Sequence, residues 1–197
     1  MKKLLLGLWL CLPAGLWAYH QGPGQNQRQL DEVDAALRSA EAELSGGNHD
    51  AALEQYELAL KNVPADQVAV AREIRLDLAR LRMQHKQLPQ AQEDLRNLVE
   101  EMSADETADP AVLEEARAAY ANAQYYITFL MRLEGYTREQ WEPEIEKSRQ
   151  VYRLLAEQAE ARGDADSALQ HKEDLEATVL LARLDLQNLQ GLPLPNQ

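Results

Sequence analysis

Four histidines are the side chains of this chain best suited to bind a metal ion or to transfer a proton near neutral pH. They are His20, His49, His85 and His171. None has another histidine four residues away or a glutamate three residues before it, the helical spacings that bring two metal ligands to one face. The sequence therefore predicts no metal site and no cofactor.

Acidic side chains are abundant, but they stand where helices face solvent or end. Glu142, Glu144 and Glu146 flank a proline, and Glu100 and Glu101 close an expected helix. The sequence also lacks a glycine-rich phosphate loop, which follows a strand. We therefore expect a non-enzymatic protein without a small-molecule substrate.

The overall charge narrows the class of partner. The 197 residues include 20 basic and 33 acidic side chains, for a formal charge of -13. Nucleic-acid binding depends on clustered cations that displace counterions, so this acidity argues against it. A protein partner is expected instead. The plainer interpretation of the negative charge is that it keeps a helical surface soluble, and the alternative is that it attracts a basic partner.

Basic side chains are nevertheless concentrated in one stretch, which makes them candidates to bind a partner's carboxylates. The alternative, which is favoured, is that they pair with neighbouring acidic helices and with Glu73 and Asp77 on their own helix. The candidates are Arg72, Arg75, Arg80, Arg82 and Lys86.

Aromatic residues form a second candidate contact set. Tyr125 and Phe129, with Tyr120 and Tyr126 nearby, fall in an expected helix and offer apolar area on more than one side. They either line a binding groove or pack in the core.

The first eighteen residues resemble a secretory signal peptide. Lys2 and Lys3 precede the apolar run Leu4–Leu16, and Ala18 ends it. The apolar run is too short for a membrane-spanning helix, so cleavage is favoured over an uncleaved membrane anchor. Lipidation of Cys11 is disfavoured by the bulky residue before it. We predict an exported protein, periplasmic or extracellular, with a flexible leader at 19–28.

Removal of the signal peptide also removes the only cysteine, so the fold depends on packing without disulfides. From Leu30 onward, apolar residues recur every three or four positions, as in amphipathic helices. Asn48 and Asp66 are expected helix caps, Thr137 with Gln140 is an expected capping box, and Pro143 should kink its helix. The predicted helices cover about 30–44, 49–63, 67–81, 89–102, 110–133, 138–161 and 166–188.

Three pairs of alanines stand twelve residues apart across an expected turn. Small residues that face each other let two helices approach closely, so this repeated spacing predicts stacked helical hairpins. The pairs are Ala40 with Ala52, Ala79 with Ala91, and Ala156 with Ala168.

These residues resemble the tetratricopeptide repeat (TPR) family, whose units are antiparallel helix pairs. In the first copy, Gly47, Ala52, Tyr56, Ala59 and Pro64 stand at the places of the family's turn glycine, small residue, aromatic, alanine and proline. The second copy keeps Ala79, Ala91, Leu95 and Leu98 but has Lys86 for the turn glycine. The third keeps Ala156, Gly163 and Ala168 but has Lys172 for the aromatic.

The resemblance implies an all-α, right-handed α-solenoid over residues 29–190, with about three hairpins and a C-terminal capping helix, seven helices in all. It implies a scaffold whose concave surface binds a peptide or helix of a partner. The copies are spaced by more than the family's period of 34 residues, and a plain helical bundle is the alternative. A self-associating subunit, a homodimer through Val179–Ala182, is the alternative function. Residues 191–197 are expected to be a disordered tail.

Overall fold

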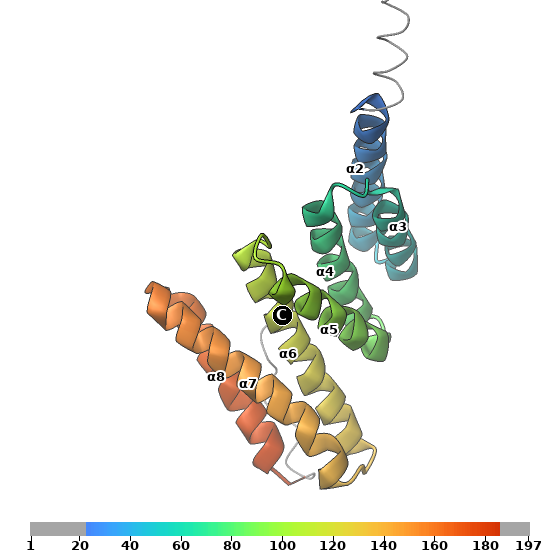
Figure 1. Ribbon diagram of the computed structural model, residues 1–197. Coiled ribbons are helices and arrows are strands. Elements are labelled where there is room, and N and C mark those ends of the chain that lie inside the picture. Colours follow the sequence, from blue (N-terminus) through green and yellow to red (C-terminus); the bar gives the residue numbers. More distant parts are fainter. Residues whose placement is uncertain (1–22, 186–197) are drawn as a thin grey trace, which may run out of the picture. The chain divides into compact units, whose positions relative to one another are not determined.

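The computed structural model describes residues 23–185, and every regular element in that range is an α-helix. The seven helices and the lack of strands among these residues confirm the predicted all-α class. The helices, shown in Figure 1, are α2 (Pro23–Ser45), α3 (His49–Asn62), α4 (Val68–Gln84), α5 (Leu88–Ala104), α6 (Pro110–Leu133), α7 (Arg138–Arg162) and α8 (Ala165–Arg183).

The first helix begins earlier than expected. Residues 23–28, assigned above to a flexible leader, belong to α2. Proline suits the first turn of a helix, and Gln27 and Arg28 are good helix formers, whereas Gly24 and Asn26 are poorer ones. The predicted signal peptide, residues 19–22 of the predicted leader, the end of the last predicted helix at 186–188 and the tail at 191–197 lie outside the described residues.

The chain divides into two compact units, and the boundary falls inside α4, between Ile74 and Arg75. In the first unit, α2 and α3 pack side by side, as Figure 1 shows. Val33 and Ala36 of α2, Ala59 of α3 and Ile74 of α4 form its buried core.

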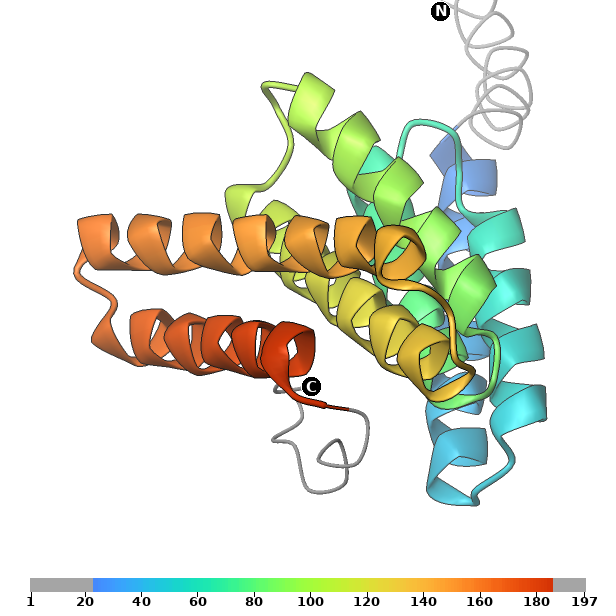
Figure 2. The ribbon, with the colours of Figure 1, turned by 90° about the horizontal axis from the view of Figure 1, so that it is seen from below.

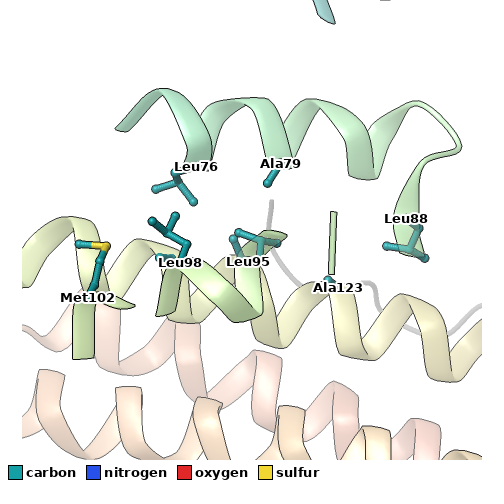
Figure 3. Packing of buried hydrophobic residues seen from close by; sticks show 9 residues of the cluster. Leu76, Ala79, Leu88, Leu95, Leu98, Met102 and Ala123 are labelled. Carbon is teal, nitrogen blue, oxygen red and sulfur yellow. The ribbon is translucent and has the colours of Figure 1, made fainter. Parts of the chain in front are cut away.

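In the second unit, α6 packs against helices on two of its faces. One face meets α4 and α5. Figure 3 shows Leu76 and Ala79 of α4 opposite Leu98 and Leu95 of α5, with Ala123 of α6 nearby. The other face of α6 packs on α7 and α8, which lie side by side in Figure 2. The core there contains Tyr125, Trp141, Ile145, Ala177 and Leu181.

The C-terminus of α8 is fixed to α6 by one arginine. The guanidinium of Arg132 donates hydrogen bonds to the carbonyl oxygens of Leu181 and Leu184 and lies 4.8 Å from the ring centre of Trp141. Burial lowers the pKa of Arg132, since the charged form is partly removed from water. The bonds satisfy carbonyls that the helix end would otherwise leave without partners.

The three hairpin turns predicted from the alanine pairs share one backbone hydrogen-bond pattern. In each, an amide reaches back five residues, from Asn48 to Glu43 (2.8 Å), from Gln87 to Arg82 (3.1 Å) and from Asp164 to Ala159 (3.0 Å). This bond is the mark of the Schellman motif, which ends a helix through a residue in the left-handed conformation. The three turns are therefore the same local structure.

The left-handed residue of each turn stands seven positions after the first alanine. It is Gly47 with φ of 76°, Lys86 with φ of 62° and Gly163 with φ of 74°. Glycine accepts this conformation without strain, whereas a residue with a Cβ atom does not. Lys86 is the only residue other than glycine with positive φ in the described part of the chain.

The alanines of the three pairs lie inside the structure. Ala40, Ala52 and Ala91 are 0% exposed and Ala79 is 1% exposed, while Ala156 and Ala168 are 4% and 5% exposed. The remaining signature residues Ala59 and Leu95 are also fully buried, and Tyr56 is partly buried in the core of the first unit. Larger side chains at these alanines would meet packed neighbours.

The helix caps agree with the sequence in part. Asp109 caps α6 by accepting from the amide of Ala111 at 2.8 Å, and Gln140 accepts from the amide of Thr137 at 2.9 Å, as the capping box requires. Asn48 occupies the cap position of α3, but its amide group donates to Glu43 instead of capping.

The predicted capping role of Asp66 is also not observed. The helix begins two residues later, at Val68, and the carboxylate of Asp66 accepts from Asn26 at 3.3 Å. In both cases a competing side-chain hydrogen bond replaces the predicted cap. Helix α7 runs through Pro143 as one continuous helix, Arg138–Arg162.

Candidate functional site

A groove of about 1260 Å³ runs along α6 in the second unit, and all of its lining residues belong to that unit. The α4–α5 turn region lines it on one side of α6, and the α7–α8 turn region lines it on the other. We call it the α6 groove. Its lining residues are Arg80, Met83, Gln84, Lys86, Leu88, Pro110, Ala111, Glu114, Glu115, Ala118, Ala119, Asn122, Tyr126, Phe129, Leu130, Arg162, Asp164, Ser167, Gln170 and His171.

The floor of the α6 groove changes character along its length. Glu114 and Glu115 lie toward the start of α6, while Tyr126, Phe129 and Leu130 lie toward its end. The helical rise of 1.5 Å per residue separates these groups by about 20 Å. Leu130 is 45% exposed although it is a large apolar residue. The groove thus joins a charged end to an apolar, partly aromatic end.

The acidic side chains of the charged end have basic or amide partners within the second unit. Glu114 accepts from Arg162 at 2.8 Å and lies 3.7 Å from Nε2 of His171, and Glu115 accepts from Arg80 at 2.9 Å. Asp164 accepts from the backbone amide of Ser167 at 3.1 Å, and the bonds from Ser167 lower the pKa of this carboxyl.

Basic and acidic groups are balanced in the α6 groove, with three arginine or lysine side chains and three carboxylates among its lining residues. Arg80 and Arg162 are held by glutamates. The side chain of Lys86 is exposed and makes no ion pair with any residue that the structure describes. The six charges of the groove therefore sum to zero in a chain of formal charge -13, and Lys86 and Asp164 are the two that make no ion pair within residues 23–185.

The predicted cluster of basic residues is divided by the fold. Arg80 lines the α6 groove, whereas Arg75 pairs with Glu101 at 2.5 Å and Arg82 with Asp94. Arg72 lies in the first unit and is 8% exposed. The alternative stated above, pairing with acidic neighbours, describes Arg75, Arg80 and Arg82.

The two aromatic candidates also separate. Phe129 lines the α6 groove, but Tyr125 is fully buried against α7 and α8, and burial raises the pKa of its hydroxyl to about 12. Tyr126, which packs edge-on against Tyr125 with ring centres 5.7 Å apart, lines the groove in its place.

Sequence reasoning missed the side of the groove that α7 and α8 supply. Arg162, Gln170 and His171 reach the groove because the α7–α8 turn returns to the start of α6, where Glu114 binds Arg162. The turn itself was visible in the sequence as Arg162 to Asp164. The long-range pairing with Glu114 had no sequence signal.

Within residues 23–185, no three histidine, cysteine, aspartate or glutamate side chains are grouped so that they could hold a metal ion. None of the helices in that range is long and apolar enough to span a bilayer. No family model, curated protein or solved structure matches this chain.

Proposed function

We propose that this chain is a TPR-like, non-enzymatic adaptor that binds a segment of a partner protein in the α6 groove. The observation that carries the proposal is the groove itself, with exposed Leu130 beside Phe129 and Tyr126 on its floor. Its volume of about 1260 Å³ exceeds the usual 300–1,000 Å³ of small-molecule pockets. A peptide segment is the better match.

The repeated turns support the same proposal. Three hairpins with one turn structure and buried alanines on both sides of the turn are what a series of TPR-like helix pairs requires. We propose a right-handed solenoid on this basis. Its binding surface would be the α6 groove, which α4, α6 and α8 line together with Leu88 of α5 and Arg162 of α7.

A matched pair of variants tests the groove. Leu130 and Leu133 are both on α6 and are 45% and 50% exposed, but only Leu130 lines the groove. The full chain is used to select ligands from a phage-displayed library of random peptides of about a dozen residues. Peptides that bind the wild type and Leu133→Glu but not Leu130→Glu support the proposal. Peptides that bind Leu130→Glu and Leu133→Glu as well as they bind the wild type contradict it.

Self-association is the alternative function. The exposed apolar residues that could mediate it differ from those predicted from the sequence. Leu181 is fully buried in the core, so the Val179–Ala182 surface predicted for a homodimer is not fully available. The exposed leucines of α7 and α8 are Leu154 at 40% and Leu169 at 59%. Light scattering of the purified chain gives the mass. A dimer that Leu169→Glu converts to a monomer would favour the structural subunit over the adaptor.

We further propose that the adaptor is exported, because of the leader at residues 1–18. The support is the sequence of the leader alone. The intact mass of the protein recovered from the producing cell measures it. A chain that starts at Tyr19 supports export with cleavage, whereas a chain that retains the apolar run supports the membrane-anchored alternative.

A further inference from the structure

We infer that Lys86 is the residue of the α6 groove that binds a carboxylate of the partner segment, and that this segment carries an acidic residue beside apolar ones. The inference rests on the proposed function and specifies the chemistry of its ligand. Three observations on Lys86 support it: its backbone conformation, its lack of an ion pair and its neighbours.

The backbone of Lys86 is held in a conformation that favours glycine. The same position of the same turn is glycine in the other two hairpins, at Gly47 and Gly163. The lysine, with φ of 62°, keeps the Schellman bond from Gln87 to Arg82 but pays the strain of a Cβ atom. Folding alone would favour glycine here. A side-chain function would account for the lysine.

The electrostatic state of the groove points to the same residue. Arg80 and Arg162 each hold a glutamate, so the charge of each guanidinium is already balanced by a carboxylate of the groove. Lys86 is exposed and has no such partner within residues 23–185. A carboxylate arriving in the groove therefore finds one free cation, and the lysine ammonium offers it a charge-assisted hydrogen bond.

The surroundings of Lys86 define the rest of the ligand. Leu88, two residues later, lines the groove and belongs to the same core cluster as Tyr126 of α6. Phe129 and exposed Leu130 continue this apolar surface along α6. A segment that places its acidic residue at Lys86 can bury apolar side chains there. The groove therefore fits a peptide that carries an acidic residue beside apolar residues.

Three substitutions separate the charge of Lys86 from its strain. Lys86→Met removes the charge and keeps the Cβ atom, Lys86→Gly removes both, and Lys86→Arg keeps the charge. We expect Lys86→Gly to raise the thermal midpoint by roughly 2–4 °C, because the left-handed strain is relieved. Lys86→Met and Lys86→Arg should leave the midpoint near that of the wild type.

Binding is measured by calorimetry with the peptides that the wild type selects from the random library. We expect these peptides to carry an acidic residue near apolar ones. Both Lys86→Met and Lys86→Gly should bind these peptides about threefold to tenfold more weakly than the wild type, while Lys86→Arg should largely retain the affinity. Replacing the acidic residue of the peptide by the corresponding amide should weaken its binding to the wild type by the same factor. The same replacement should not change the affinity of the peptide for Lys86→Met.

The possible failures can be told apart. Peptides that require Leu130 but lack an acidic residue, or that bind Lys86→Met as well as the wild type, overturn the role of Lys86 and leave the adaptor function intact. Peptides that are insensitive to Leu130→Glu overturn both. A Lys86→Gly variant that is less stable than the wild type overturns the argument from strain.

Discussion

The hydroxyl of Ser148 on α7 donates a hydrogen bond of 2.8 Å to the backbone carbonyl oxygen of Ala121 on α6. Both residues are fully buried, at 0% exposure. Their small side chains let α6 and α7 approach closely, and the hydroxyl finds its partner on the other helix. This contact joins the two helices that carry the floor of the α6 groove and the start of its α7–α8 side.

Replacement of Ser148 by alanine should lower the free energy of unfolding of the second unit by about 1 kcal/mol, because a buried hydrogen bond is lost. Thermal unfolding followed by circular dichroism measures the change. Ser45→Ala is the matched control, since that hydroxyl donates to a backbone carbonyl, Glu41 at 2.9 Å, but is exposed. A larger loss for Ser45 than for Ser148 would contradict the assignment.

The left-handed turn residue provides a second prediction. Gly47 has φ of 76° and open space around the position of a Cβ atom, so Gly47→Ala should be destabilising through backbone strain alone, by about 1 kcal/mol. The neighbouring Gly46 is not among the glycines with positive φ, and a Cβ atom there would meet only ordinary contacts at 3.4 Å or more. Gly46→Ala should therefore change the stability little. Chemical denaturation compares the two variants. Equal effects would show that the turn does not require the left-handed residue.

The buried alanines predict a different kind of sensitivity. Ala40 is 0% exposed where α2 packs in the first unit, so Ala40→Leu should cost about 1–3 kcal/mol by overpacking. Ala42 on the same helix is exposed, and Ala42→Leu should be tolerated. The midpoint of urea unfolding reports both. If Ala40→Leu proves as stable as Ala42→Leu, the fold of the first unit does not require the close approach of α2 and α3.

Asp164 gives a prediction about pH. The side-chain and backbone bonds from Ser167 hold the pKa of this carboxyl below its ordinary value, so the ionised form stabilises the folded state. That stabilisation is present above the unfolded pKa of about 3.9 and is lost as the pH falls through the lower pKa of the folded state. Asp164→Ala should therefore lower the thermal midpoint at neutral pH, by an amount that shrinks in acid.

Asp164→Ser is the control for this titration, because serine keeps an acceptor for the cap without an ionising carboxyl. Its difference from Asp164→Ala should stay constant across the acidic range. A difference between wild type and Asp164→Ala that is the same at pH 7 and well below the ordinary aspartate pKa would contradict the assigned hydrogen bonds.

The sequence predicted helices and turns well because both depend on neighbours along the chain. Apolar spacing located the helices, and Gly47, Gly135 and Gly163 marked turns at which the structure has positive φ. The caps expected at Asn48 and Asp66 failed because each side chain has a competing partner, Glu43 in one case and Asn26 in the other. Such competition is decided by geometry rather than by residue type.

The candidate site was harder to predict because it depends on contacts between distant residues. Tyr125 and Phe129 are one turn apart on α6, yet α7 and α8 cover the first and leave the second in the groove. Likewise, the sequence does not distinguish Arg75 from Arg80 as a candidate. In the structure, each pairs with a different glutamate, Arg75 with Glu101 and Arg80 with Glu115. Residue type and period identify a helix face, but they do not tell which neighbour covers it.

The neutrality of the α6 groove within an acidic chain has a kinetic consequence. At a distance, an acidic segment meets the field of the whole protein, which repels it, and only near contact does it meet the ammonium of Lys86. Added salt screens the distant repulsion, since the Debye length falls to about 8 Å at 0.15 M, and it therefore speeds association. The same salt weakens the contact once formed. Such a partner would arrive and leave faster as ionic strength rises.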